Sequence, residues 1–211
     1  KETQISNNFY ITLGKVPFYD SWINYKVCGK NILNVNDCVL DNPEVVNLIN
    51  KKVKKVDILF SQFSYARYIP EEQQKKIAAE CFDRIKLQDR ILKPSYIVPF
   101  ASFIYFSHSE NYKMNKNINT VQSVYNFITE NCSAHPVILE PNEKWNLNKK
   151  DNNVSLKFWS KIYDSISNLK YNNSIIKVDS KTLEEKSKNY LKRIYKNNEK
   201  FLIYFLYKLK F

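Results

Sequence analysis

Apolar residues follow two alternating rhythms along most of this chain. Short apolar runs of strand length are separated by longer segments in which apolar residues recur every three or four positions, the period of an amphipathic helix. The alternation of strand and helix predicts an α/β fold in which helices cover a sheet. The predicted strands are residues 9–13, 22–27, 31–35, 58–63, 97–105 and 136–140, and the predicted helices are residues 42–52, 70–92, 120–131 and 154–169.

Two of these helices begin with recognisable signals. Asn42 precedes Pro43, which suits an N-cap followed by proline in the first turn. Pro70 precedes Glu71 and Glu72, whose carboxylates are favoured at the positive end of a helix macrodipole. Both helices are therefore expected to start at these residues.

The C-terminal region has a different pattern. Residues 182–195 are predicted to form an amphipathic helix, and residues 174–178 either a strand or a linker before it. Residues 201–211 form an apolar run that is too short to span a bilayer and is expected to be a helix that docks on a protein body. We therefore predict a folded domain over residues 1–150 and a helical extension over residues 151–211.

Composition places the chain among globular proteins and limits its partners. Of its 211 residues, 44% are hydrophobic and 15% are aromatic, which is enough to form a core. The net charge of +12 comes mostly from lysines spread along the chain, so a nucleic-acid partner is not favoured. Only Gly14 and Gly29 are present, which excludes a glycine-rich phosphate loop. No segment has the pattern of a signal peptide or the length of a membrane span, and no membrane partner is expected.

The four cysteines carry no metal-binding signature of their own. Cys28, Cys38, Cys81 and Cys132 include no C-x-x-C pair, which excludes a zinc ribbon and a thioredoxin-type motif. Two disulfides are arithmetically open, but buried thiols in a reducing compartment are favoured for a chain of this size. A cytoplasmic location is therefore expected.

The first candidate site follows the predicted strand 97–105. His108, Glu110 and Asn111 come directly after it, where a core strand presents side chains at the edge of a sheet. An imidazole supported by a carboxylate and an amide can orient a substrate or exchange a proton with it, so these three are predicted as catalytic residues. The alternative is that His108 is a hydrogen-bonded structural residue.

The second candidate is Asp37, which follows the predicted strand 31–35. A carboxylate at the end of a core strand is a candidate for a functional site, and the alternative is that Asp37 caps the turn before the next helix. Asp37 and His108 could belong to one metal site, but two groups do not hold a metal. Cys38 is weighed as a nucleophile against a small buried hydrophobic residue, and the second is favoured. A serine hydrolase would need a nucleophile elbow, which is absent.

Several ordered segments resemble one known family. V-D-I-L-F-S-Q-F-S-Y-A-R-Y and P-S-Y-I-V-P-F-A-S-F-I-Y-F-S-H-S-E-N-Y resemble the metallo-β-lactamase-like domain of the CMP-N-acetylneuraminate hydroxylase group and its bacterial relatives. The segments F-Y-D-S-W-I-N-Y, I-L-N-V-N-D-C-V-L and V-I-L-E-P-N-E-K-W fit the same group. The likeness covers roughly residues 8–148.

The resemblance implies a four-layered α/β/β/α sandwich, of which this chain is half or more, followed by the helical extension. Residues 1–150 would be the C-terminal part of that domain. The H-x-H-x-D-H loop that supplies most metal ligands in the family is absent, so a missing N-terminal segment or a second chain would carry it. Asp37 falls where the bridging aspartate sits. Near Pro99 and Phe100, where ordinary members have their last ligand histidine, there is none.

The function implied by the resemblance is metal-dependent, with zinc or iron. The chain would be part of a hydrolase, or of a protein related to the hydroxylation of a CMP-sialic acid-like sugar nucleotide. The basic surface would favour an anionic small-molecule substrate. Asp37 would bind the metal, while His108, Glu110 and Asn111 would act on the substrate. The alternative is a metal-free binding or scaffold subunit with the same fold. A weaker alternative, based on charge and aromatic content, is a nucleic-acid-binding module.

Overall fold

The computed structural model describes residues 2–17, 20–148, 150–169 and 177–209. The chain divides into two compact units, residues 1–172 and 173–211, which are described separately. The first unit extends beyond the predicted boundary at residue 150, because the helix that follows packs on its neighbour in the same unit. Of the predicted strand or linker at 174–178, residues 174–176 lie outside the described residues, and 177–178 form no strand.

The first unit is built on a seven-stranded mixed sheet whose spatial order follows the chain. The first four strands pair in an antiparallel manner, and the fourth to seventh pair in parallel. This arrangement confirms the predicted α/β class. The strands are β1 (Glu2–Ser6), β2 (Phe9–Lys15), β3 (Ser21–Val27), β4 (Lys30–Asn34), β5 (Ile58–Gln62), β6 (Tyr96–Phe100) and β7 (His135–Pro136).

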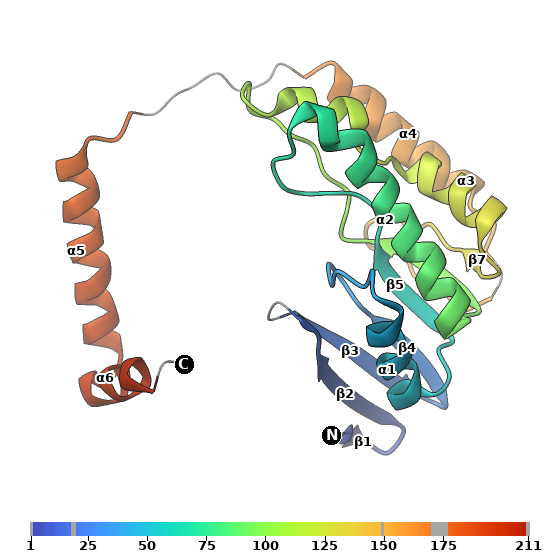
Figure 1. The fold of residues 1–211 in the computed structure, drawn as a ribbon, viewed down its shortest axis with the longest axis horizontal. Coiled ribbons are helices and arrows are strands. Elements are labelled where there is room, and N and C mark those ends of the chain that lie inside the picture. The colour runs from blue at the N-terminus through green and yellow to red at the C-terminus, as the bar shows by residue number, and fades with distance from the viewer. Residues whose placement is uncertain (1, 18–19, 149, 170–176, 210–211) are drawn as a thin grey trace. The chain divides into compact units, whose positions relative to one another are not determined.

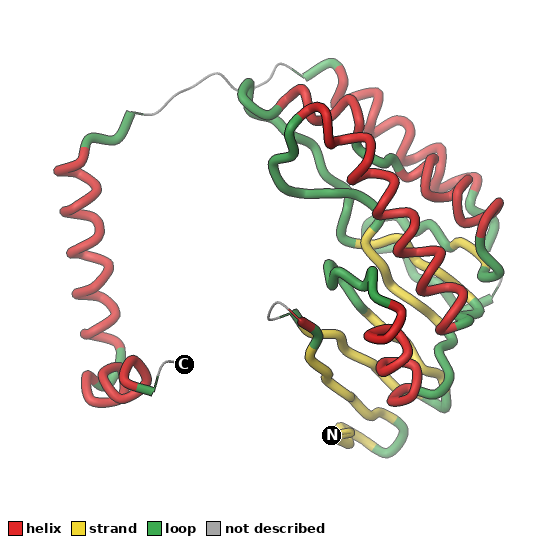
Figure 2. The backbone as a smooth tube through the Cα atoms, in the orientation of Figure 1, coloured by secondary structure: helices red, strands yellow, loops and turns green. Residues whose placement is uncertain are grey.

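Four helices connect and follow the parallel strands, and they lie against one face of the sheet (Figure 1 and Figure 2). Neighbouring helices contact one another in chain order. Both predicted starting signals are confirmed: the Asn42 side chain accepts a hydrogen bond from the Glu44 N–H at 2.7 Å, and Pro70 precedes the first turn of the longest helix. The helices are α1 (Pro43–Val53), α2 (Glu71–Leu92), α3 (Val121–Asn131) and α4 (Asn153–Ser167), with a short 3₁₀ helix η2 (Tyr112–Asn117) before α3.

The alternation of side chains along each strand separates two apolar faces. The strand register places Leu33, Leu59 and Ile97 next to one another on the face that the helices cover, and all three are fully buried. Apolar residues of α1, α2 and α3 complete this core, among them Val46 and Ile85. Burial of such aliphatic side chains is the main favourable contribution to folding.

The second face of the sheet is also apolar. Ile58, Val98 and Val137 are buried there, and Trp145 packs edge-on against Tyr96 with ring centroids 5.1 Å apart. The apolar surface continues across β4 to β2 and β3 with half-buried side chains, namely Phe9, Ile11, Ile23, Tyr25, Val27 and Ile32. A sheet exposed to water on one face usually carries mainly polar residues there, whereas on this face of β2, β3 and β4 the polar side chains lie only at strand ends.

Two strand predictions differ from the structure, and one strand was not predicted. The strand predicted at 97–105 ends at Phe100, because Ala101 adopts a positive φ of 55° and the chain turns away. The strand predicted at 136–140 pairs only over His135–Pro136 in β7. β1 was not predicted, because all five of its residues are exposed and give no apolar signal.

The second unit contains helices α5 (Ser180–Asn197) and α6 (Lys200–Lys208). α5 begins two residues before the predicted start, because Asp179 caps it by accepting a hydrogen bond from the Thr182 N–H at 2.8 Å. Within the described ranges, no helix has both the length and the apolar character needed to cross a bilayer.

Asp57 ties the starts of β4 and β5 together. It is only 3% exposed, and its carboxylate accepts hydrogen bonds from the Asn31 N–H at 3.0 Å and from the Lys30 ammonium at 3.2 Å. Burial alone would raise the pKa of this carboxyl, but the Asn31 N–H and Lys30 outweigh it and hold the pKa below its usual value. The ionised form therefore stabilises the fold at neutral pH.

We expect Asp57→Asn to lower the free energy of unfolding at pH 7 by roughly 1–3 kcal/mol, since a charge-assisted contact is lost. Because the folded pKa is depressed, this contribution is complete above the usual carboxyl pKa and disappears as the pH falls through the folded pKa. Urea unfolding at neutral and acidic pH measures the difference. Asp83→Asn, at an exposed position on α2, is the control; an equal loss in both variants, or a difference that persists in acid, would contradict this role.

Candidate functional site

The strongest candidate site lies at the edge of the sheet where the parallel strands end. β4, β5 and β6 run in the same direction, so the loops that follow them leave from one edge. Ligands of α/β proteins bind beyond the carboxyl ends of parallel strands. Both stretches that the sequence singled out, around Asp37 and around His108, belong to these loops.

A pocket of about 530 Å³ opens at this edge between two of the loops and α2. Its size is suited to a small molecule. The loop after β4 and the loop after β5 form one side. The middle of α2, from Ile77 to Leu87, forms the other. The lining residues are Asp37, Val39, Asp41, Gln62, Tyr65, Ala66, Arg67, Ile77, Glu80, Asp83, Arg84 and Leu87.

Charged side chains of both signs line this pocket together with apolar ones. Arg67 and Arg84 supply guanidinium groups, which bind phosphate or carboxylate through paired hydrogen bonds. Four carboxylates can accept hydrogen bonds from ligand hydroxyl groups. They belong to Asp37, Asp41, Glu80 and Asp83. The arrangement suits a ligand that carries both an anionic group and several hydroxyls.

The two arginines differ in how they are held. Arg84 donates a hydrogen bond from Nη2 to the Cys81 Sγ at 3.0 Å and a longer one from Nε to the Glu80 carbonyl at 3.4 Å. Burial raises the pKa of the Cys81 thiol, against the opposing effect of Arg84, so Cys81 is an acceptor here and no nucleophile. Arg67 is exposed and forms no ion pair within the described part of the chain, which leaves its guanidinium available to a ligand.

Tyr65 joins the pocket wall to the segment around η2. Its hydroxyl donates a hydrogen bond to the Met114 carbonyl at 2.9 Å, and its ring stacks on Phe106 with centroids 6.2 Å apart. Burial raises the pKa of this phenol, so the hydroxyl stays protonated and keeps donating. The loop that carries His108 therefore packs behind the wall of the pocket.

A buried polar network fixes the loops at this edge. The Ser102 hydroxyl accepts hydrogen bonds from the Phe63 and Ser64 N–H groups, both at 3.0 Å. The Asn119 side-chain amide donates to the Phe63 carbonyl at 2.8 Å and to the Ala78 carbonyl at 2.7 Å, and the Asn119 N–H donates to the Ser64 hydroxyl. The loops after β5 and β6, the first half of α2 and the start of α3 are thereby held as one piece.

His108 starts a tight turn. Its carbonyl accepts hydrogen bonds from the Asn111 and Tyr112 N–H groups, and its Nδ1 accepts one from the Glu110 N–H at 3.3 Å. The Glu110 carboxylate lies 3.7 Å from the same Nδ1. The two contacts exclude one another, because Nδ1 must offer a lone pair in the first and a proton in the second.

The structure brings Asp37 into the pocket but not the other three predicted residues. His108, Glu110 and Asn111 do not line it, and Glu110 is 80% exposed in its side chain. Asn111 Oδ1 is buried and has no hydrogen-bond partner among the described residues. The predicted catalytic roles of these three residues stay predictions.

The described residues do not fit a metal centre on their own. Nowhere in the described ranges do three His, Cys, Asp or Glu side chains come together as metal ligands. Asp37 is exposed on the pocket rim, and its neighbour Cys38 is buried, with its Sγ 3.4 Å from the Ser21 carbonyl. Burial, with Asp20 and Asp37 nearby, raises the pKa of Cys38 to about 11, so the thiol is protonated at neutral pH and suits the buried-residue alternative.

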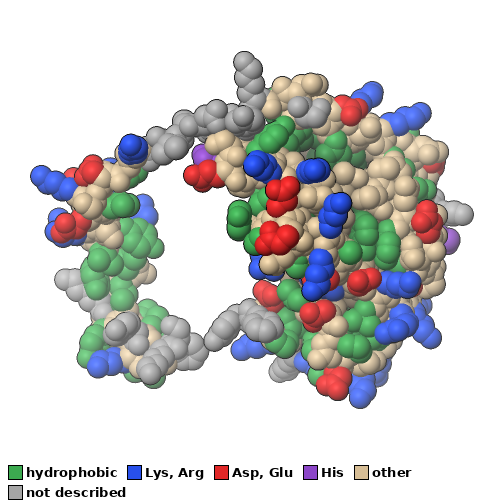
Figure 3. All heavy atoms as spheres, turned by 45° about the horizontal axis from the view of Figure 1, so that its top comes forward, with side chains coloured by type: hydrophobic (Ala, Val, Ile, Leu, Met, Phe, Trp, Pro, Cys, Tyr) green, Lys and Arg blue, Asp and Glu red, His purple; other side chains and the backbone are tan. Residues whose placement is uncertain are grey.

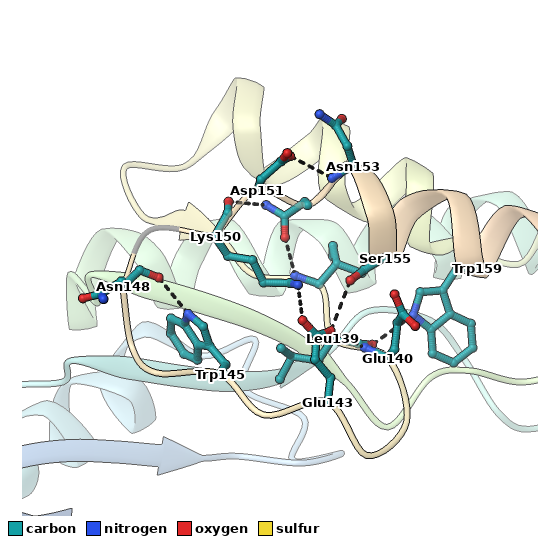
Figure 4. Close-up of polar contacts among 12 residues, drawn as sticks. Leu139, Glu140, Glu143, Trp145, Asn148, Lys150, Asp151, Asn153, Ser155 and Trp159 are labelled. Carbon is teal, nitrogen blue, oxygen red and sulfur yellow. Dashed lines mark hydrogen bonds and ion pairs between the residues drawn. The ribbon is translucent and has the colours of Figure 1, made fainter.

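The loop after β7 contains the family-like segment V-I-L-E-P-N-E-K-W and is held by hydrogen bonds of its own side chains (Figure 4). Glu143 accepts hydrogen bonds from the Lys150 ammonium, the Ser155 hydroxyl and the Glu140 N–H. Burial opposes ionisation of Glu143, but these partners, Lys150 foremost, hold its pKa below the usual value. The Trp145 indole N–H donates to the Asn148 carbonyl at 2.7 Å. The Glu143 carboxylate and the Trp145 indole thus have partners in this loop and at the start of α4, and V-I-L-E-P-N-E-K-W covers the second face of the sheet through Leu139 and Trp145.

Sequence reasoning missed most of the pocket. Arg67 stands in the quoted segment Y-A-R-Y, but no spacing rule relates it to Asp37. Glu80 and Arg84 are four residues apart on α2, which is the usual pattern of a solvated helix face. Only the strand-end position of Asp37 gave a usable signal.

Comparisons with known proteins find partial likeness to solved structures. No family model and no curated protein matches the chain. Two structures of CmlA, one of them a mutant and the other described as a diiron beta-hydroxylase from Streptomyces venezuelae, align with 66% of this chain at 8% and 9% identity and TM-scores of 0.43 and 0.42. A protein described as a Zn-dependent hydrolase of the metallo-beta-lactamase superfamily from Thermotoga maritima aligns with 62% of this chain at 14% identity and a TM-score of 0.31.

This chain spans less than two thirds of the length of each of these proteins. The aligned part covers 31% and 32% of the two CmlA chains and 63% of the Thermotoga maritima chain. At these TM-scores the matches describe a partial likeness of the backbone and carry no argument about a site.

We expect Asn119→Ala to lower the free energy of unfolding by about 2–4 kcal/mol, because two buried carbonyls lose their donor. The loops around the pocket should also become more mobile. Urea unfolding measures the first effect, and backbone hydrogen exchange of residues 62–67 the second. Asn126→Ala on the exposed side of α3 is the matched control and should change stability by less than about 0.5 kcal/mol. Equal behaviour of the two variants would show that the network does not fix this edge.

Proposed function

We propose that this chain is the C-terminal part of a metallo-β-lactamase-like domain and binds an anionic sugar or sugar nucleotide in the pocket at the sheet edge. The observation that carries the proposal is the position of Asp37, at the carboxyl edge of β4, on the rim of a pocket that also contains Arg67 and Arg84. The family resemblance places the bridging aspartate of a metal site at the same residue. The enzyme class proposed is a zinc- or iron-dependent hydrolase, or a protein related to sugar-nucleotide hydroxylation.

The chemistry of the pocket supports a ligand of this kind. A phosphate or a sialyl carboxylate would be held by the guanidinium groups. Sugar hydroxyls would donate hydrogen bonds to the carboxylates around them. An anion without hydroxyl groups would leave Asp37, Asp41, Glu80 and Asp83 unused and close enough to repel it.

A metal centre at Asp37 requires ligands from outside the described residues. The resemblance assigns them to a preceding segment or a second chain with the H-x-H-x-D-H loop. A zinc or iron ion there would supply an activated water and polarise the substrate. Since the described side chains do not form a ligand set, no catalytic step is assigned to them. Asp37 is proposed as the contribution of this chain to the ligand set.

The second face of the sheet supports such a completing half. Half-buried apolar side chains on β2 and β3, among them Ile11, Ile23 and Tyr25, continue the buried cluster around Ile58 and Val98. Two sheets of a sandwich pack through apolar faces of this kind, about 10 Å apart. A second sheet on this face would also bring its loops to the edge where Asp37 lies.

A second candidate function is that of a metal-free binding or scaffold subunit with the same fold. The pocket favours it in one respect: two arginines and four carboxylates can bind a sugar phosphate without a metal. The two candidates share the ligand and differ in the metal and in the completing half.

The ligand prediction is tested with Arg67→Met. Loss of a charge-assisted contact to an anionic group should weaken binding of CMP-N-acetylneuraminate by roughly 10- to 100-fold, measured by isothermal titration calorimetry. Arg90→Met is the matched control, because Arg90 is an exposed arginine of α2 outside the pocket. Unchanged binding in Arg67→Met, or an equal loss in the control, would remove the pocket from consideration.

The metal prediction is tested by native mass spectrometry with metal analysis of the protein purified from its own source. A complex with bound zinc or iron, whose metal content falls in Asp37→Asn but not in Asp83→Asn, is expected if the chain contributes to a metallo-enzyme. A metal-free protein that still binds the sugar nucleotide would decide for the binding subunit. Metal content that is independent of Asp37 would contradict its role as a ligand.

A further inference from the structure

The second unit exposes an unusual amount of apolar surface. In α5, Leu183, Tyr190 and Ile194 recur at helical spacing and share one side of the helix, with Leu191 beside them. α6 has seven consecutive apolar or aromatic positions between its terminal lysines. In Figure 3, hydrophobic side chains are visible along the unit that contains these helices.

These side chains are open to solvent within their unit. Phe201 is 78% exposed and Tyr204 is 60% exposed. Single exposed apolar residues are common on protein surfaces, but a continuous group of this size marks an interaction site. The large exposed hydrophobic residues of α5 and α6 are Leu183, Tyr190, Leu191, Tyr195, Phe201, Leu202, Tyr204, Phe205 and Leu206.

Basic residues border this apolar surface. Residues 177–209 contain nine Lys and Arg against four Asp and Glu, and no acidic residue follows Glu199. On α5, Lys188 borders the apolar side on one edge, where it pairs with Glu184, and Lys186 and Arg193 border it on the other, as the helical spacing requires. The Arg193 guanidinium lies 5.5 Å from the centre of the Tyr190 ring, and the Lys208 ammonium lies 5.6 Å from that of Tyr204.

We propose that α5 and α6 form a peripheral anchor that lies on an anionic lipid surface. The apolar and aromatic side chains would enter the boundary between headgroups and acyl chains, while lysines and arginines contact the anionic headgroups. The positive charge favours this partner. An apolar groove in a protein does not need lysines and arginines around its ligand, whereas a surface of anionic lipids attracts each of these side chains. Tyrosine rings, with a polar tip on an apolar body, suit the same interface.

The expectation of no membrane partner rested on length, which concerns helices that span a bilayer. A helix that lies in the interface needs an apolar side and a basic border instead. It does not need to be long enough to span the bilayer, so α6 is not too short for this role. The expected alternative for α6, docking on a protein body, is an outcome of the experiment below. The anchor is independent of the pocket and of its proposed ligand.

The anchor is tested by co-sedimentation of the full chain with vesicles. Vesicles of phosphatidylcholine with about 30% phosphatidylglycerol should bind the chain, and binding should weaken severalfold in pure phosphatidylcholine and with added salt, because both reduce the electrostatic attraction. A chain that stays in the supernatant with the anionic vesicles would overturn the proposal and favour docking on a protein. Equal binding to both vesicle types would overturn the role of the basic border.

Two variants locate the binding surface. Phe201→Ser combined with Phe205→Ser should weaken binding to the anionic vesicles at least tenfold, because both aromatic rings are lost from the interface. Lys186→Gln combined with Arg193→Gln should weaken it by roughly 25-fold, about fivefold for each charge. Leu48→Ser on α1, where the leucine is 63% exposed, is the control and should bind as the unchanged chain does. Equal binding in all variants would overturn the assignment.

Folding of the first unit is checked in the same samples. All three tryptophans, Trp22, Trp145 and Trp159, lie in that unit, so their fluorescence reports on its fold and not on the substituted helices. An unchanged emission spectrum together with lost vesicle binding assigns the loss to α5 and α6. If the double phenylalanine variant shows an altered spectrum, the variant Lys186→Gln with Arg193→Gln decides the assignment.

Discussion

The buried side chain of Asn119 is the contact on which the functional edge of the sheet depends. Its amide donates to carbonyls of two different segments, at Phe63 beyond β5 and at Ala78 in α2, and its own N–H donates to Ser64. Backbone groups buried away from water must be paired, and Asn119 pairs groups of both segments at once. The pocket walls formed by Tyr65, Arg67 and α2 take their positions from this constraint.

The fold could be predicted where a strand or helix is defined by burial on one side. Leu33, Leu59 and Ile97 come from apolar runs, and the sheet places them in register, as the alternation of strand and helix predicts. The prediction was wrong where an apolar run continues past the strand: Phe103 and Phe106 extend the pattern beyond β6, although Ala101 has already turned the chain. Aromatic residues in that loop pack on other side chains, and sequence periodicity does not distinguish this from pairing in a sheet.

The site could be predicted only in part, for a similar reason. Asp37 was predicted as a candidate because it follows a predicted core strand. The end of that strand fixes the position of Asp37 at the edge of the sheet. His108 follows an equally apolar run, but Asn115 exchanges two hydrogen bonds with the backbone of Phe106, both at 2.8 Å, and these hold its loop behind the pocket wall. Arg67 and Arg84 reach the pocket from a loop and a helix face, and their approach depends on tertiary packing that no local pattern contains.

The two apolar surfaces of this chain call for different partners, and charge distinguishes them. On the second face of the sheet, the outward side chains of β2, β3 and the middle of β4 include a single lysine, Lys15 at the end of β2, while Lys26 points to the opposite face by strand alternation. Because Lys15 lies at a strand end, another sheet can cover the apolar middle of this face and leave the ammonium group in water. On α5 and α6, burial in a dry interface would desolvate Lys186, Lys188 and Arg193 at considerable cost. A lipid surface would leave their charged ends in water among anionic headgroups, so charge favours the proposed second sheet for one apolar surface and the proposed lipid surface for the other.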